Sequence, residues 1–76
     1  MKIEVLFFAE IKEALGQSHR FMEVSDGVSI SEVVQLLGHE LEGRTLVFAV
    51  NEDFETGDQK LKDQDQLAIM TPMSGG

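Results

Sequence analysis

Cysteine is absent from the 76-residue chain, and proline occurs once. Without cysteine the protein can form neither a disulfide framework nor a cysteine-ligated zinc site, and it has no thiol nucleophile. Basic residues are also scarce: six Lys and Arg stand against fourteen Asp and Glu, a formal net charge of −8. Because phosphate binding requires clustered Lys and Arg, this balance argues against nucleic acid and anionic membrane surfaces as partners.

Long hydrophobic runs are missing as well. The longest apolar run, from Val5 to Ala9, is far shorter than the roughly 20 residues that a membrane-spanning helix needs. The first residues, Met-Lys-Ile-Glu-Val, do not follow a signal-peptide pattern. A chain of this size has room for one small domain, and we expect it to be soluble and cytoplasmic.

Hydrophobic alternation predicts strands over residues 2–8, 18–24 and 66–71. A fourth predicted strand, 45–50, is apolar at nearly every position. This composition is typical of a central strand covered on both faces, or of a strand with one face covered by a partner. Residues 54–60 are expected to be irregular.

Two helices are predicted. Helix formers fill residues 9–15, and Gly16 follows at a natural position for a left-handed C-terminal cap. The longer helix begins after Ser29, which forms a capping box with Glu32, and ends at Gly38 or Gly43. Its apolar residues recur at helical spacing: Ile30, Val33, Val34, Leu37 and Leu41.

The predicted order is strand, short helix, strand, long helix, strand, strand. This order gives an α+β domain in which a small mixed sheet carries one main helix across it, the β-grasp or ubiquitin-like arrangement. We expect this domain to span residues 1–72, and residues 73–76 to form a flexible Gly-Gly tail.

A catalytic or metal site is not predicted within the domain. The two histidines, His19 and His39, stand in a predicted strand and near the helix end, with no nucleophile motif or phosphate-binding loop beside them. Asp63 and Asp65 lie two residues apart, but no further oxygen ligands follow at calcium-binding spacing. We therefore expect no metal and no cofactor bound by this chain.

The C-terminal segment is where chemistry is expected. Pro72 ends the last strand, and the side chains then shrink from Met73 through Ser74 to Gly75 and Gly76. Such a segment can enter a narrow channel in which a Cβ would clash. Its reactive group is the Gly76 α-carboxylate, which is ionised at pH 7.

A carboxylate is a poor electrophile, so it requires activation, for which a mixed anhydride with AMP is the natural form. Nothing in the sequence is suited to binding ATP, so the activating enzyme must be a separate protein. The activated carbonyl of Gly76 can then accept nitrogen, which gives an isopeptide bond, or sulfur, which gives a thiocarboxylate.

Four segments carry a resemblance to a known family: VLFFA at 5–9, AVN at 49–51, LKDQDQL at 61–67 and PMSGG at 72–76. The whole chain resembles the small subunit of molybdopterin synthase, a ubiquitin-like sulfur carrier of molybdenum cofactor biosynthesis. One departure lies in the turn before the last strand, where Gln64 stands at the usual place of a glycine.

The resemblance implies that an E1-like enzyme uses ATP to adenylate Gly76, and that a sulfur donor protein converts it to a thiocarboxylate. The segment from Met73 to Gly76 would then insert into the large subunit of the synthase. There the sulfur would pass to cyclic pyranopterin monophosphate. On this reading the chain is not catalytic alone, and the active-site bases belong to the large subunit.

A docking surface is expected on the sheet face that turns away from the long helix. Leu6, Phe8 and Met70 are predicted to lie there, and Phe48 to join them. Coverage of this face by a short helix or loop is the alternative. An uncovered apolar face of this kind would be a partner interface, and methionine adapts readily to different partners.

Other functions remain open at this point. A carrier of the thiamine pathway would share the fold and the Gly-Gly end, but it usually lacks the LFFA and Pro-x-Ser pattern. A protein modifier would be joined through Gly76 to lysines of its targets. A binding module would make no use of Gly75 and Gly76.

Overall fold

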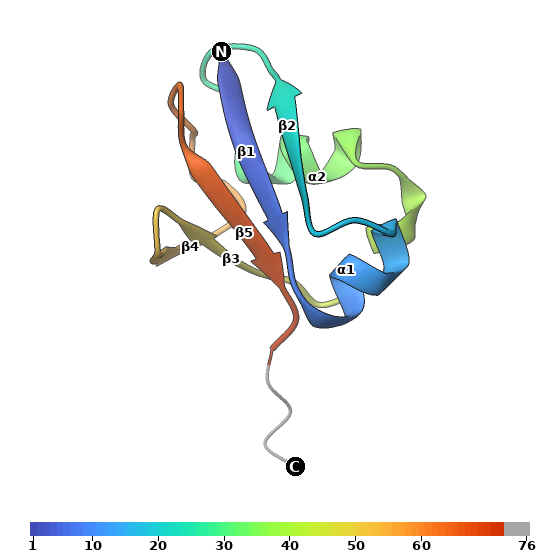
Figure 1. Ribbon diagram of the computed structural model, residues 1–76. Helices are drawn as coiled ribbons and strands as arrows, with labels where there is room; N and C mark the ends of the chain where they lie inside the picture. Colours follow the sequence, from blue (N-terminus) through green and yellow to red (C-terminus); the bar gives the residue numbers. More distant parts are fainter. Residues whose placement is uncertain (73–76) are drawn as a thin grey trace.

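The computed structural model describes residues 1–72 of the chain (Figure 1). In this range the backbone forms five strands, two α-helices and one 3₁₀ helix. In chain order the elements are β1 (Lys2–Phe7), α1 (Ala9–Leu15), β2 (His19–Glu23), α2 (Ile30–Leu36), η1 (His39–Leu41), β3 (Val47–Val50), β4 (Asp53–Glu55) and β5 (Gln66–Met70).

One mixed sheet organises the described chain, with the strand order β2-β1-β5-β3-β4. The two strands from opposite ends of the sequence, β1 and β5, pair in parallel, and the other neighbours pair antiparallel. The helix α2 lies across one face of the sheet (Figure 1). The predicted α+β class and β-grasp arrangement are confirmed.

The hydrophobic core lies between that face and the helices. Inward residues of β1 and β5 alternate with outward ones, as the pleat of a strand requires. They pack against the buried face of α2 and against Ile11 of α1. The cluster consists of Ile3, Val5, Phe7, Ile11, Val24, Val28, Ile30, Val33, Leu37, Leu41, Leu61, Leu67 and Ile69.

The start of α2 is fixed by the predicted capping box. The Glu32 N–H donates to Ser29 Oγ over 3.2 Å, and the Ser29 N–H donates to Glu32 Oε1 over 3.0 Å. The second bond favours the ionised carboxylate, so the backbone N–H of Ser29 lowers the pKa of Glu32. The helix ends with Leu37 as its cap, and Gly38 follows with φ +104°. Leu41 is buried through η1 rather than through α2.

A short strand lies where an irregular segment was expected. The strand β4 pairs with β3 through a tight turn in which Asn51 and Glu52 have φ of +49° and +76°. Two successive positive φ values are typical of the type I′ turn that joins antiparallel strands. The expectation of an irregular segment directly after residue 53 is therefore wrong.

The strand β3 is shorter than predicted and lies second from the edge, whereas β5 is central. The placement of Phe48 on the face away from the helix is also wrong. Phe48 is opposite Ile69, whose side chain is fully buried, and it packs against the core together with Val50. The uniform apolar composition of this segment hid which of its residues point inward.

The turn before β5 contains a residue in the left-handed region. Gln64 has φ +72°, at the position where the sequence departs from the expected glycine. The turn is tied to β1, because the Gln64 N–H donates to Lys2 O over 2.7 Å and the Lys2 N–H donates to Asp63 Oδ1 over 2.8 Å. The bond from Lys2 lowers the pKa of Asp63.

Removing the cap of α2 is expected to destabilise the fold. Ser29→Ala takes away the acceptor for the Glu32 N–H, and a lost cap costs about 1 kcal/mol in the free energy of unfolding. Urea denaturation at pH 7 measures this loss. The same change is expected to raise the pKa of Glu32, which carboxyl NMR titration measures, because the Ser29 hydroxyl that helps to lower this pKa is gone.

The pH dependence provides a check on the same cap. The pKa of Glu32 is lower in the folded chain, so its stabilising contribution is complete above the ordinary value of 4.5 and is lost as the pH falls through the folded value. Glu32→Gln should therefore lower stability at pH 7, and this difference should shrink in acid. A difference that stays constant from pH 7 to pH 2 would contradict the assignment.

Relieving the strained turn is expected to stabilise the fold. Gln64→Gly removes a Cβ from the left-handed region and should raise the free energy of unfolding by up to about 1 kcal/mol. Gln59→Gly is the matched control, because Gln59 is exposed and has a negative φ; this variant should be less stable. Equal effects of the two substitutions would contradict the strain at residue 64.

Candidate functional site

The candidate site lies where the chain leaves the sheet after β5. Because β1 and β5 are parallel, their C-terminal ends meet at the same edge, beside α1 (Figure 1). The Phe8 N–H donates to Ile69 O over 3.3 Å, which ties the end of β1 to the end of β5. Thr71 and Pro72 follow β5 as the last described residues. The central strand β5 thus ends beside Phe8 and α1.

The predicted tail residues Met73, Ser74, Gly75 and Gly76 lie outside the described residues. Their proposed roles depend on their chemistry and on the position of Pro72, where the described chain ends. Because Pro72 lies two residues beyond the end of β5, residues 73–76 begin close to the end of the central strand.

Beside this exit, apolar residues line the sheet face that turns away from α2. Leu6 is opposite Ala68, Met70 is opposite Val47, and Ala49 is opposite both Ala68 and Phe54. Phe8 lies two residues after Leu6 and is also extended, so its side chain points to the same side of the sheet. We call this surface the outer apolar face; it consists of Leu6, Phe8, Val47, Ala49, Phe54, Ala68 and Met70.

Within this face the two phenylalanines are the most accessible large side chains, with 47% of Phe8 and 74% of Phe54 exposed. Leu6 and Met70 are half-buried. Both α-helices of the described chain contribute their buried residues to the core on the other face of the sheet. The structure therefore brings three of the four predicted interface residues to one surface and leaves Phe48 on the opposite side.

Two further exposed phenylalanines, Phe54 and Phe21, were not predicted from the sequence. Phe54 lies on the unpredicted strand β4, and the signal that could have found it was the short turn directly after an apolar strand. Phe21 is 59% exposed on β2, opposite Glu4. It lies on the same side of the sheet as the outer apolar face, but on the edge strand β2, and Lys2 Nζ lies 5.3 Å from its ring centre.

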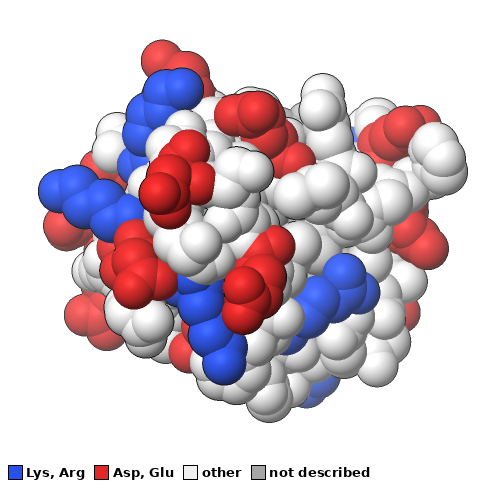
Figure 2. Space-filling view, turned by 90° about the horizontal axis from the view of Figure 1, so that it is seen from above, with Lys and Arg blue, Asp and Glu red and all other residues white. Residues whose placement is uncertain are grey.

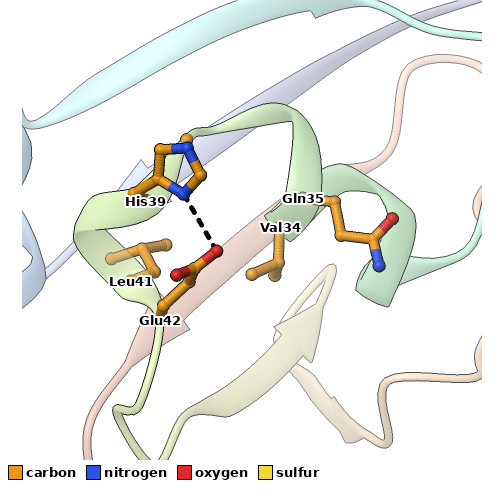
Figure 3. Close-up of a pocket in the computed structure, with 6 residues that line it drawn as sticks. Val34, Gln35, His39, Leu41 and Glu42 are labelled. Carbon is orange, nitrogen blue, oxygen red and sulfur yellow. Dashed lines mark hydrogen bonds and ion pairs between the residues drawn. The ribbon is translucent and has the colours of Figure 1, made fainter.

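A small hollow beside α2 offers no catalytic arrangement. It has a volume of about 190 Å³, with Val34 and Leu41 in its lining, and Gln35, His39 and Glu42 around it (Figure 3). His39 Nδ1 lies 2.9 Å from Glu42 Oε1, but both side chains are largely exposed to solvent. An exposed contact of this kind contributes little energy and lacks the dry surroundings that activate a catalytic group.

Carboxylates dominate the charged surface. Figure 2 looks down on the end that carries the N-terminus, where Asp and Glu side chains are spread among the Lys and Arg side chains. Among residues 1–72 the His, Asp and Glu side chains do not form a group of three suited to a metal ion. Within the same residues no helix is both long and apolar enough to cross a membrane. The candidate site is therefore the end of β5, where the chain leaves the sheet beside the outer apolar face. The molecule that carries this site is strongly acidic.

Comparison with known proteins decides the family. The sequence pattern of the ThiS family matches residues 5–76, which is nearly the whole chain. The chain belongs to the ThiS family. It is 34% identical to the molybdopterin synthase sulfur carrier subunit of Chlamydomonas reinhardtii, and the match covers 100% of both chains.

Solved structures of other proteins have the same fold. Small archaeal modifier protein 1 of Haloferax volcanii matches with a TM-score of 0.84 and 18% identity, over 95% of this chain and 98% of that chain. A chain from the complex of subunits 1 and 2 of the molybdopterin-converting factor from Helicobacter pylori matches with a TM-score of 0.71 and 25% identity, over 100% of both chains. The first likeness concerns the fold alone.

Proposed function

We propose that this ThiS-family chain is the sulfur-carrier subunit of a molybdopterin synthase. The observation that carries the proposal is the end of the central strand: β5 leaves the sheet beside an apolar face, and the sequence continues into Ser74, Gly75 and Gly76. The full-length similarity to a molybdopterin synthase sulfur carrier subunit supports it.

The chemistry follows from the terminal carboxylate. An E1-like adenylyltransferase binds ATP, and the Gly76 carboxylate attacks the α-phosphate to give an acyl-adenylate and pyrophosphate. A hydrosulfide equivalent from a sulfur donor protein then displaces AMP, so that one carboxylate oxygen is replaced by sulfur. The product is a thiocarboxylate, and the carrier itself needs neither a metal nor a bound cofactor for these steps.

The sulfur is next transferred within the large subunit. The segment Met73–Gly76 enters that subunit, and the thiocarboxylate sulfur forms a bond to a side-chain carbon of cyclic pyranopterin monophosphate as a C–O bond at that carbon breaks and its oxygen leaves as water or with the phosphate. Water then hydrolyses the resulting thioester, which restores the Gly76 carboxylate and leaves the sulfur on the pterin. A dithiolene holds two sulfur atoms, so two loaded chains are consumed for each product. Proton transfers in these steps fall to groups of the large subunit.

Docking uses the outer apolar face. Leu6, Phe8 and Met70 lie on it next to the exit of β5, so contact through this face places the terminal segment at the partner's surface. The net charge of −8 favours a partner with a basic rim, which would steer association and make its rate fall with added salt.

The test of the function is the intact mass of the chain. Incubation with ATP, the cognate activating enzyme and a sulfur donor should raise the mass by about 16 Da, since sulfur replaces one oxygen. An added alanine after Gly76 should abolish dithiolene formation. The terminal carboxyl group then belongs to a residue with a Cβ, and it lies one residue farther from the folded domain.

Two outcomes contradict the proposal. One is an unchanged mass with an activating enzyme that adenylates the chain; the other is full dithiolene formation from the extended chain. Amide linkage of Gly76 to lysines of other polypeptides, in place of thiocarboxylate, would establish a protein modifier. Delivery of sulfur to a thiazole precursor would establish a carrier of the thiamine pathway.

A pair of phenylalanines tests the docking face. Phe8→Ser removes an exposed ring beside the exit of β5 and should weaken binding to the large subunit about tenfold, the usual effect of an interface anchor. Phe21→Ser removes a somewhat more exposed ring from the edge strand β2, away from the exit of β5, and serves as the control.

Calorimetric titration of the large subunit with each variant gives both affinities, and circular dichroism shows whether each variant is folded. The control should bind within about twofold of the unaltered chain. Equal losses for the two variants would remove the outer apolar face from the proposed interface.

A further inference from the structure

The junction between β1 and α1 contains a residue in an unfavourable backbone conformation. Ala9, the first residue of α1, has φ +49°, a region that residues other than glycine rarely adopt. The strain arises between the Cβ and the backbone, so glycine would remove it. Ala9 is exposed, and its methyl group therefore adds little to the core.

This residue controls how the chain turns from the sheet into the helix. On one side, the Phe8 N–H donates to Ile69 O of β5 over 3.3 Å. On the other, Phe8 O accepts from the Ile11 N–H over 3.0 Å and from the Lys12 N–H over 3.4 Å. Phe8 is extended, with φ −125° and ψ 152°, and Ala9 makes the change of direction that follows.

The turn has opposite consequences for the two residues around it. Ile11 is completely buried in the core, whereas Phe8 remains 47% exposed at the end of the outer apolar face. A backbone turn that is held within a narrow range of angles fixes both side chains at once. A flexible turn would keep Ile11 buried, because burial holds it, but would leave the exposed Phe8 free to move.

We propose that Ala9 is a positioning residue for docking on the large subunit, an inference that rests on the function proposed above. Its Cβ restricts the left-handed junction to few conformations, and this holds the Phe8 side chain beside the exit of β5. Glycine at position 9 would adopt the positive φ without strain, but its backbone would have more conformational freedom. Docking would then have to restrict that freedom, at a cost in binding free energy.

Two substitutions separate strain from stiffness. Ala9→Gly removes both, whereas Ala9→D-Ala removes the strain, since a D-residue favours positive φ, but keeps the Cβ. A chain of 76 residues is within reach of stepwise synthesis and ligation, so each variant and the unaltered chain can be made with the C-terminal thiocarboxylate already in place. Dithiolene formation with the large subunit and cyclic pyranopterin monophosphate then gives KM and kcat for each loaded carrier.

We expect any change to be in KM, with kcat unchanged. Ala9→Gly should raise KM about two- to fivefold, which corresponds to the ordering of one glycine, and leave kcat unchanged. Ala9→D-Ala should keep KM near that of the unaltered chain. Gln64→Gly is the matched control, because it relieves the same kind of strain at the opposite end of β5 and should leave KM unchanged.

Three results would overturn the positioning role: an unchanged KM for Ala9→Gly, an equal rise for Gln64→Gly, or an equal rise for Ala9→D-Ala. In each case the unaltered thiocarboxylate chain still turns over, and the proposed function stands. Absence of dithiolene from the unaltered loaded chain would instead refute the proposed function, and the inference about Ala9 with it.

Discussion

The parallel pairing of β1 with β5 is the interaction on which the rest of the structure depends. It joins the two ends of the sequence at the centre of the sheet, and the buried residues of both strands form the middle of the core. Because the strands are parallel, the end of β5 emerges where β1 turns into α1. The same pairing that completes the hydrophobic core therefore sets the place from which the C-terminal segment starts, and the outer apolar face begins at that place.

The chemistry assigned to this protein needs little from its own side chains. The chain contains no cysteine, and the ion pair of His39 with Glu42 is exposed. In the proposed function the chain supplies a terminal carboxylate on two glycines, a surface for docking and a negative net charge that favours a basic partner. In the proposed function, activation, proton transfer and exclusion of water belong to its partner proteins.

Local signals in the sequence were sufficient for much of the fold. The capping box at Ser29, the glycine after α1 and the alternation in β1 and β5 each have one physical reading, and the structure has all three. Phe48 shows the limit, because an apolar run has no alternation from which to tell its two faces apart. The strand β4 is three residues long and held by pairing with β3, so its composition carries no strand signal. Positive φ at Ala9 depends on how β1 meets α1, which only the tertiary structure shows.

The central claim is that sulfur leaves this protein from its own C-terminus. The most direct measurement loads Gly76 with a thiocarboxylate that carries labelled sulfur, then supplies the large subunit and cyclic pyranopterin monophosphate with no other sulfur source. The account predicts that the label appears in the dithiolene and that the mass of the chain returns to that of the carboxylate form, with two chains spent for each product. Label that stays on the chain, or that is released as hydrosulfide while no dithiolene forms, would contradict it.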